Sequence, residues 1–182
     1  MKRFKKQLAT LVSAGLMTAL TLNFNACTEQ SPLNSELSAT GFKILKSQNT
    51  RLNKAFQRSK SINKGGGKIE IGDKKHGISK LVIPKGALAD EVLIAFWWES
   101  TGFLEGGADF SPHGTNFNEP VRLELSYKAA DLTGVNESDL EIRYYNEKTG
   151  QWELIGNQID RKKKVVIGFT DHFSRYAIGA GE

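Results

Sequence analysis

Short runs of alternating apolar and polar residues, separated by turn residues, make up the chain from residue 68 onward. In the run 121–127, Val, Leu, Leu and Tyr alternate with Arg, Glu and Ser, as in a strand with one buried and one solvated face. Gly, Pro, Asn and Asp lie between the runs and favour turns. The pattern predicts strands at residues 68–71, 79–83, 92–98, 121–127, 140–145, 151–155, 165–169 and 173–178.

Two of the connections between these runs are short and polar, which favours antiparallel pairing of the strands beside them. Segments 148–150 and 160–163 are expected to be hairpin loops, and 131–136 is expected to supply one helical turn. Many short strands at regular spacing are typical of a β-sandwich, and residues 65–182 are enough chain to bury one core. We therefore predict an all-β fold, an antiparallel β-sandwich over 65–182 that folds without the residues before it.

Residues 1–26 have the pattern of a secretory signal peptide. Basic residues at positions 2–6 precede an uncharged, mostly apolar run at 8–22, which is shorter than the roughly 20 residues that span a bilayer. The chain is therefore expected to be exported.

The end of this signal peptide resembles the lipobox of bacterial lipoproteins. The only cysteine of the chain, Cys27, follows Ala26, and no second cysteine could pair with it in a disulfide. The resemblance implies cleavage before Cys27 and acylation of Cys27, which anchors the protein to a membrane through more than one acyl chain. In many bacterial lipoproteins an Asp after the cysteine signals retention in the inner membrane. Thr28 stands at this position, so the resemblance implies the outer membrane. The alternative is an unmodified thiol beside an ordinary cleavage site.

Beyond Cys27, residues 27–64 are expected to form a basic, flexible linker, because they are polar and lack sustained periodicity. A membrane-associated helix in 42–64 is a second interpretation, since four apolar side chains could share one face of it: Phe42, Leu45, Leu52 and Phe56. The net charge of the whole chain is +5, but without the four basic residues of the signal peptide 21 basic residues face 20 acidic ones. This near balance gives no indication of nucleic-acid binding.

Several short motifs between residues 66 and 176 occur in combination. They are Gly66-Gly67, Ile83-Pro84-Lys85-Gly86-Ala87-Leu88, Phe110-Ser111-Pro112-His113-Gly114, Glu119-Pro120-Val121, Gly150-Gln151-Trp152 and His172-Phe173-Ser174-Arg175-Tyr176. Together they resemble the ZU-5 domain, a β-sandwich module of zonula occludens proteins, netrin receptors and ankyrins that also occurs in bacterial surface proteins. The resemblance covers about residues 65–180 and implies a domain that binds or scaffolds other proteins.

The motif His172-Phe173-Ser174 is where the resemblance implies a reaction, because some ZU-5 relatives cleave themselves at such a motif. The Ser174 hydroxyl would attack the carbonyl of Phe173, with His172 as the proton acceptor. The simpler interpretation is structural: Phe173 packs inward, Ser174 faces out and His172 completes a turn. We favour the structural interpretation, because cleavage would release only residues 174–182.

Other signals of catalysis or metal binding are weak. The histidines lack the short spacing of metal ligands, and the sequence contains no G-x-S-x-G motif. We therefore expect no enzyme activity and no cofactor. We also expect no metal, since a metal site would need long-range assembly of residues such as His76, His113, His172, Asp109 and Asp171.

Trp97 and Trp98 are neighbours in one predicted strand, so their rings should lie on opposite faces of a sheet. The ring outside the core could bind a sugar or a protein partner. Three functions therefore stay open. A lipid-anchored protein-interaction module is favoured over a self-processing protein and a carbohydrate- or cell-wall-binding module.

Overall fold

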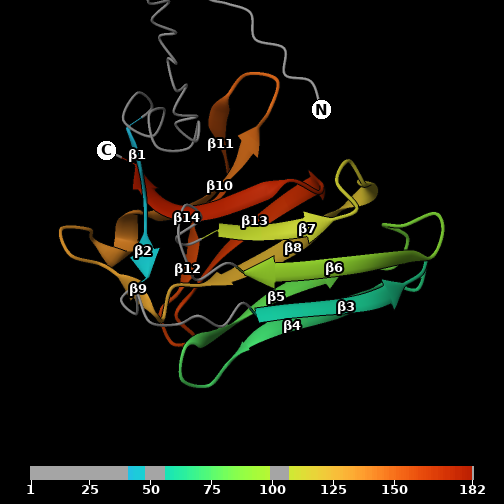
Figure 1. Ribbon diagram of the computed structural model, residues 1–182, viewed down its shortest axis with the longest axis horizontal. Helices are drawn as coiled ribbons and strands as arrows, with labels where there is room; N and C mark the ends of the chain where they lie inside the picture. The colour runs from blue at the N-terminus through green and yellow to red at the C-terminus, as the bar shows by residue number, and fades with distance from the viewer. Residues whose placement is uncertain (1–40, 48–55, 99–106, 182) are drawn as a thin grey trace, which may run out of the picture.

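The computed structural model describes residues 41–47, 56–98 and 107–181, and nearly all of them belong to strands and the turns between them (Figure 1). Two antiparallel sheets pack face to face, so the predicted all-β sandwich is confirmed. The expected signal peptide 1–26 and the expected lipidation site Cys27 lie outside the described residues. No helix within the described ranges is long and apolar enough to cross a membrane.

Strands follow one another along the chain with short connections. They are β1 (Phe42–Ile44), β2 (Lys46–Ser47), β3 (Phe56–Ile62), β4 (Gly67–Asp73), β5 (Gly77–Ile83), β6 (Val92–Trp98), β7 (Gly107–Ser111), β8 (Asn116–Ser126), β9 (Ala130–Asp131), β10 (Leu140–Asn146), β11 (Gln151–Gly156), β12 (Gln158–Asp160), β13 (Val165–His172) and β14 (Arg175–Gly181). A 3-10 turn, η1 (Glu137–Asp139), precedes β10.

The larger sheet has the order β11-β10-β14-β7-β6-β3, with β1 also paired to β14. The smaller sheet has the order β12-β13-β8-β5-β4, and β2 pairs with β9 at one end of the sandwich. Sequence alternation sets the inner faces: in β8, Leu123 and Leu125 are fully buried, whereas Arg122 and Ser126 are partly exposed. One continuous core forms between the sheets.

The prediction of a flexible linker is wrong for the described part of residues 42–64. Phe42, Leu45 and Ile62 are at most 2% exposed, and β3 pairs with β6 along its whole length. Neither a membrane-associated helix nor a solvated linker describes these residues. The segment looked like a linker because β3 is an edge strand whose middle residues are polar and exposed, and charged edge strands discourage pairing with other chains.

Smaller differences from the expected strands have local causes. The strand expected at 121–127 begins earlier, at Asn116. Pro120 therefore lies inside β8, where the pairing with β13 shifts register and a missing N–H costs little. The expected helical turn at 131–136 is instead the 3-10 turn Glu137–Asp139. The last strand begins at Arg175, so Phe173 and Ser174 belong to the connection before it.

Candidate functional site

The connection between β13 and β14 places Phe173 in the core. Its ring stacks on Phe110 with centroids 5.2 Å apart and meets the edge of Phe117 at 4.8 Å. Its backbone N–H donates to the carbonyl of Thr115 over 2.9 Å. The carbonyl of the preceding residue, His172, accepts a hydrogen bond from the Tyr176 hydroxyl. Both the ring and the backbone at this position are therefore held by native contacts.

His172 and Ser174 make separate contacts on either side of Phe173. The Ser174 hydroxyl donates to the carbonyl of Tyr145 over 3.0 Å. The His172 ring lies 2.8 Å from the Asp171 carboxylate through Nδ1 and packs against the edge of Tyr144. No hydrogen bond within the described ranges joins the His172 ring to the Ser174 hydroxyl. This geometry favours the structural interpretation of the motif, since a proton acceptor must lie within hydrogen-bond reach of the nucleophile.

We expect purified protein to keep its full mature mass after prolonged incubation at neutral pH, because the Ser174 hydroxyl is bound to Tyr145 and not to a base. Intact-mass spectrometry under denaturing conditions is the measurement, with Ser174→Ala as the control. Loss of the peptide 174–182 from wild type but not from the variant would show self-processing.

Next to His172, a polar cluster joins β10 to β11. The Tyr144 hydroxyl donates to one carboxylate oxygen of Glu153, and the Asn146 amide donates to the other over 2.6 Å. The hydrogen bond from Tyr144, followed by that from Asn146, lowers the pKa of Glu153 below its ordinary value. The same hydrogen bond raises the pKa of Tyr144. Both carboxylate oxygens of Glu153 accept hydrogen bonds from β10, so this cluster stabilises the pairing of β10 with β11.

The lowered pKa of Glu153 has a consequence for acid stability. A carboxyl whose pKa is lower in the folded state stabilises that state above its unfolded pKa, and the effect is lost as pH falls through the folded pKa. Glu153→Gln should therefore destabilise the protein at about pH 7 and much less at about pH 3. Urea unfolding of both proteins at the two pH values is the test, with Glu147→Gln in the adjacent turn as control. A pH-independent difference between wild type and Glu153→Gln would refute the assignment.

Each histidine of the chain pairs with an aspartate near it in sequence. The imidazole–carboxylate distances are 2.9 Å for His76 with Asp73, 3.0 Å for His113 with Asp109 and 2.8 Å for His172 with Asp171. Within the described ranges, no group of three or more potential ligands gathers around one point. The pairs give each histidine a structural partner: His76 and His113 lie in turns, and His172 is the last residue of β13.

Trp97 and Trp98 lie on opposite faces of the larger sheet, as predicted from alternation. Trp98 packs against the core. In the strand register, Trp97 lies opposite Asp109 of β7, and Asp109 lies opposite Arg175 of β14. The Asp109 carboxylate also lies 3.0 Å from the His113 ring. The half-buried Trp97 ring is therefore next to a row of charged side chains on the outside of the larger sheet.

The outside of the smaller sheet combines exposed apolar side chains with ion pairs. Ile78 of β5 is 45% exposed and Phe169 of β13 is 52% exposed. Phe169 pairs with Arg122 of β8, and Arg122 lies 2.8 Å from the Glu124 carboxylate. We call this surface the outer face of the smaller sheet; it is formed by Glu70, Ile78, Lys80, Arg122, Glu124 and Phe169.

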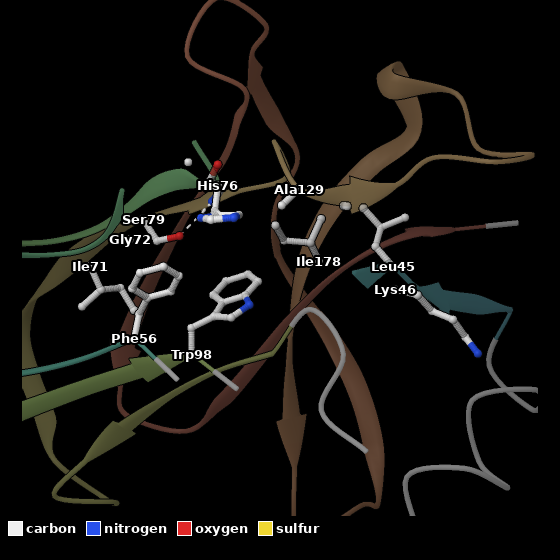
Figure 2. Close-up of a pocket in the computed structure, with 13 residues that line it drawn as sticks. Leu45, Lys46, Phe56, Ile71, Gly72, His76, Ser79, Trp98, Ala129 and Ile178 are labelled. Carbon is white, nitrogen blue, oxygen red and sulfur yellow. Dashed lines mark hydrogen bonds between the residues drawn. The ribbon is translucent and has the colours of Figure 1, made fainter. Parts of the chain in front are cut away.

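Sequence reasoning did not anticipate a cavity that lies between the sheets near β2 and β9. Phe56 and Trp98 line it from the larger sheet, and Ile71 and His76 line it from β4 and the turn after it (Figure 2).

Comparison of the chain with protein-family models and with curated proteins finds no match. The resemblance to ZU-5 domains therefore stays a prediction that rests on the motifs.

Proposed function

We infer that this protein is a lipid-anchored component of the bacterial cell envelope, in the outer membrane, whose ZU-5-like β-sandwich binds another protein. The observation that carries the inference is the outer face of the smaller sheet. Its apolar side chains are large and exposed, and the same face carries two ion pairs: Lys80 with Glu70 between β5 and β4, and Arg122 with Glu124 within β8. Aromatic or aliphatic anchors within a charged border are typical of protein interfaces.

The outer face is rigid, which favours recognition. Its strands are the central and edge strands of a continuous antiparallel sheet, paired from β13 through β8 to β5 and β4. Lys80 holds Glu70 at 3.0 Å, and Glu124 is 5% exposed beside Arg122. A partner that meets this surface finds side chains already in place, so little conformational entropy is lost on binding.

Membrane anchoring through Cys27 rests on the signal peptide and the lone cysteine. Wild-type protein should enter the detergent phase on Triton X-114 partitioning, whereas Cys27→Ser should stay in the aqueous phase, because the acyl chains supply the membrane affinity. Mass spectrometry of the N-terminal peptide checks the modification directly. An unmodified wild-type protein in the aqueous phase, starting at another residue, would contradict acylation.

The partner-binding role is tested by co-isolation from cross-linked cells. Phe169→Ser and Ile78→Ser should reduce the co-isolated partner at least about tenfold, as expected for central interface residues. Leu93→Ser is the matched control, since Leu93 is 64% exposed on the larger sheet. Equal yields from all four proteins, with unchanged melting temperatures, would contradict the proposed surface.

A carbohydrate-binding function is the second candidate, and the row Trp97–Asp109–Arg175 favours it. Sugar sites combine an aromatic platform with charged hydrogen-bonding groups, and both are present here. Pull-down with purified cell-wall polysaccharide should then retain wild type and lose Trp97→Ala. Retention that is equal for both proteins, or absent for wild type, excludes this function.

A further inference from the structure

The cavity between the two sheets has the composition of a small ligand site. Its volume is about 60 Å³, and its wall is mainly apolar: Leu45, Phe56, Ile71, Trp98, Ala130 and Ile178. In Figure 2 the imidazole of His76 stands over the rings of Phe56 and Trp98. The centroids of His76 and Phe56 are 6.1 Å apart. Ser79 and Ser126 also line the cavity, but both serine oxygens already have hydrogen-bond partners in the protein, which leaves the His76 ring as the polar group for a ligand. An apolar pocket with few convergent polar groups is the usual form of a small-molecule site.

His76 supplies that polar group, and Asp73 fixes how it is presented. Nδ1 of His76 lies 2.9 Å from both carboxylate oxygens of Asp73, so Nδ1 carries a hydrogen and donates it. The backbone N–H of His76 donates to the same carboxylate. Nε2 is buried and has no hydrogen-bond partner among the described residues. The fold therefore orients one ring nitrogen at the cavity without using it.

The chemistry of Nε2 selects the polar group of the ligand. With its hydrogen on Nδ1, neutral His76 offers Nε2 as an acceptor, whereas the protonated ring offers an N–H donor. A hydroxyl both donates and accepts, so it can pair with either form of the ring. A carbonyl or an ether oxygen accepts only and cannot pair with neutral His76.

The size and lining of the cavity select the rest of the ligand. One water requires about 10–15 Å³ of such volume, so the cavity admits a compact group of about four carbon atoms. Phe56 and Trp98 would contact those carbons from one sheet, and Ile71 from the other. No carboxylate lines the cavity, and the lining residue Lys46 is exposed. A charged ligand would therefore lose its hydration without gaining a buried counter-ion, so a neutral ligand is favoured.

We propose that this cavity binds a small branched alcohol, with the hydroxyl on Nε2 of His76 and the carbons between Phe56, Trp98 and Ile71. The site is separate from the outer face of the smaller sheet, because none of the residues that form that face lines the cavity. Its occupancy does not depend on the proposed protein partner.

Two isomers test the proposal, isobutanol and diethyl ether, because only the alcohol has a hydroxyl hydrogen. The full chain with Cys27→Ser is titrated with each, so that no acyl chain competes, and the indole N–H signals of its tryptophans are followed by NMR. Isobutanol should shift the Trp98 signal saturably and leave Trp97 unchanged. Diethyl ether should bind about tenfold more weakly, the value expected for one lost hydrogen bond.

Variants assign the effect to the cavity. His76→Leu should remove the preference for the alcohol, whereas His113→Leu, at a histidine outside the cavity, should keep it. Ala130→Leu fills the cavity and should abolish binding, which keeps the test decisive if His76→Leu fails to fold. Equal affinity of wild type for the two isomers, shifts that do not saturate, or unchanged binding by Ala130→Leu would each overturn the proposal.

Discussion

A chain that begins at Gly65 should fail to unfold cooperatively, although the sequence pattern alone suggested that 65–182 folds by itself. Truncation removes β1 and β3 and with them three nearly fully buried side chains, Phe42, Leu45 and Ile62. Each contributes about 1.5–3 kcal/mol by burial, and the sum is comparable with the roughly 5–15 kcal/mol that stabilise a whole domain. The truncation also removes β3 from one side of β6, so that β6, still paired with β7, becomes the edge of the larger sheet.

Packing around Phe42 adds to this expectation. Its ring lies 5.9 Å from that of Trp152, and Arg143 stacks over it at 4.7 Å. Gly179 makes room for it, since an added Cβ there would lie 2.4 Å from the Phe42 ring. Thermal unfolding followed by circular dichroism compares chains that begin at Gly41 and at Gly65. Two equally stable proteins would show that the N-terminal strands are dispensable.

Phe173→Ala should destabilise the protein by about 3–5 kcal/mol, the usual cost of removing a buried phenyl ring. Phe173 is 3% exposed and contacts both Phe110 and Phe117, so the cavity left behind is bordered by rigid rings. Urea unfolding measures the change in the free energy of unfolding. Phe169→Ala is the control, because that ring is half exposed and its loss should cost far less. A Phe173→Ala midpoint equal to that of wild type would contradict the assignment of this residue to the core.

Periodicity predicted the strands whose two faces differ in environment. The run 92–98 matches β6 at both ends, and 140–145 matches β10 to within one residue. β3 escaped prediction because its central side chains are all exposed, and β7 because four of its five residues are buried. Neither strand alternates, so a period of two cannot be read from them. Their positions follow from pairing with β6, which is information that a single sequence does not contain.

Local sequence explains part of the candidate sites. Asp73 precedes His76 by three residues in a turn, a spacing from which their hydrogen bond could have been expected. The cavity could not be predicted, because Phe56, His76 and Trp98 come from three different segments and meet only when the two sheets pack. Trp152 is buried outside the main core, where it packs with Phe42 and Ala177. Its cover is supplied by a segment that was expected to be a linker.

The central claim is that the outer face of the smaller sheet binds a protein partner in the cell envelope. Site-specific photo-cross-linking in living cells tests it, with a photoreactive amino acid placed at position 169 of the full chain. We expect a discrete cross-linked adduct from position 169 and none from position 93, which is at least as accessible on the other sheet. No adduct from position 169, or the same adduct from both positions, would contradict the account.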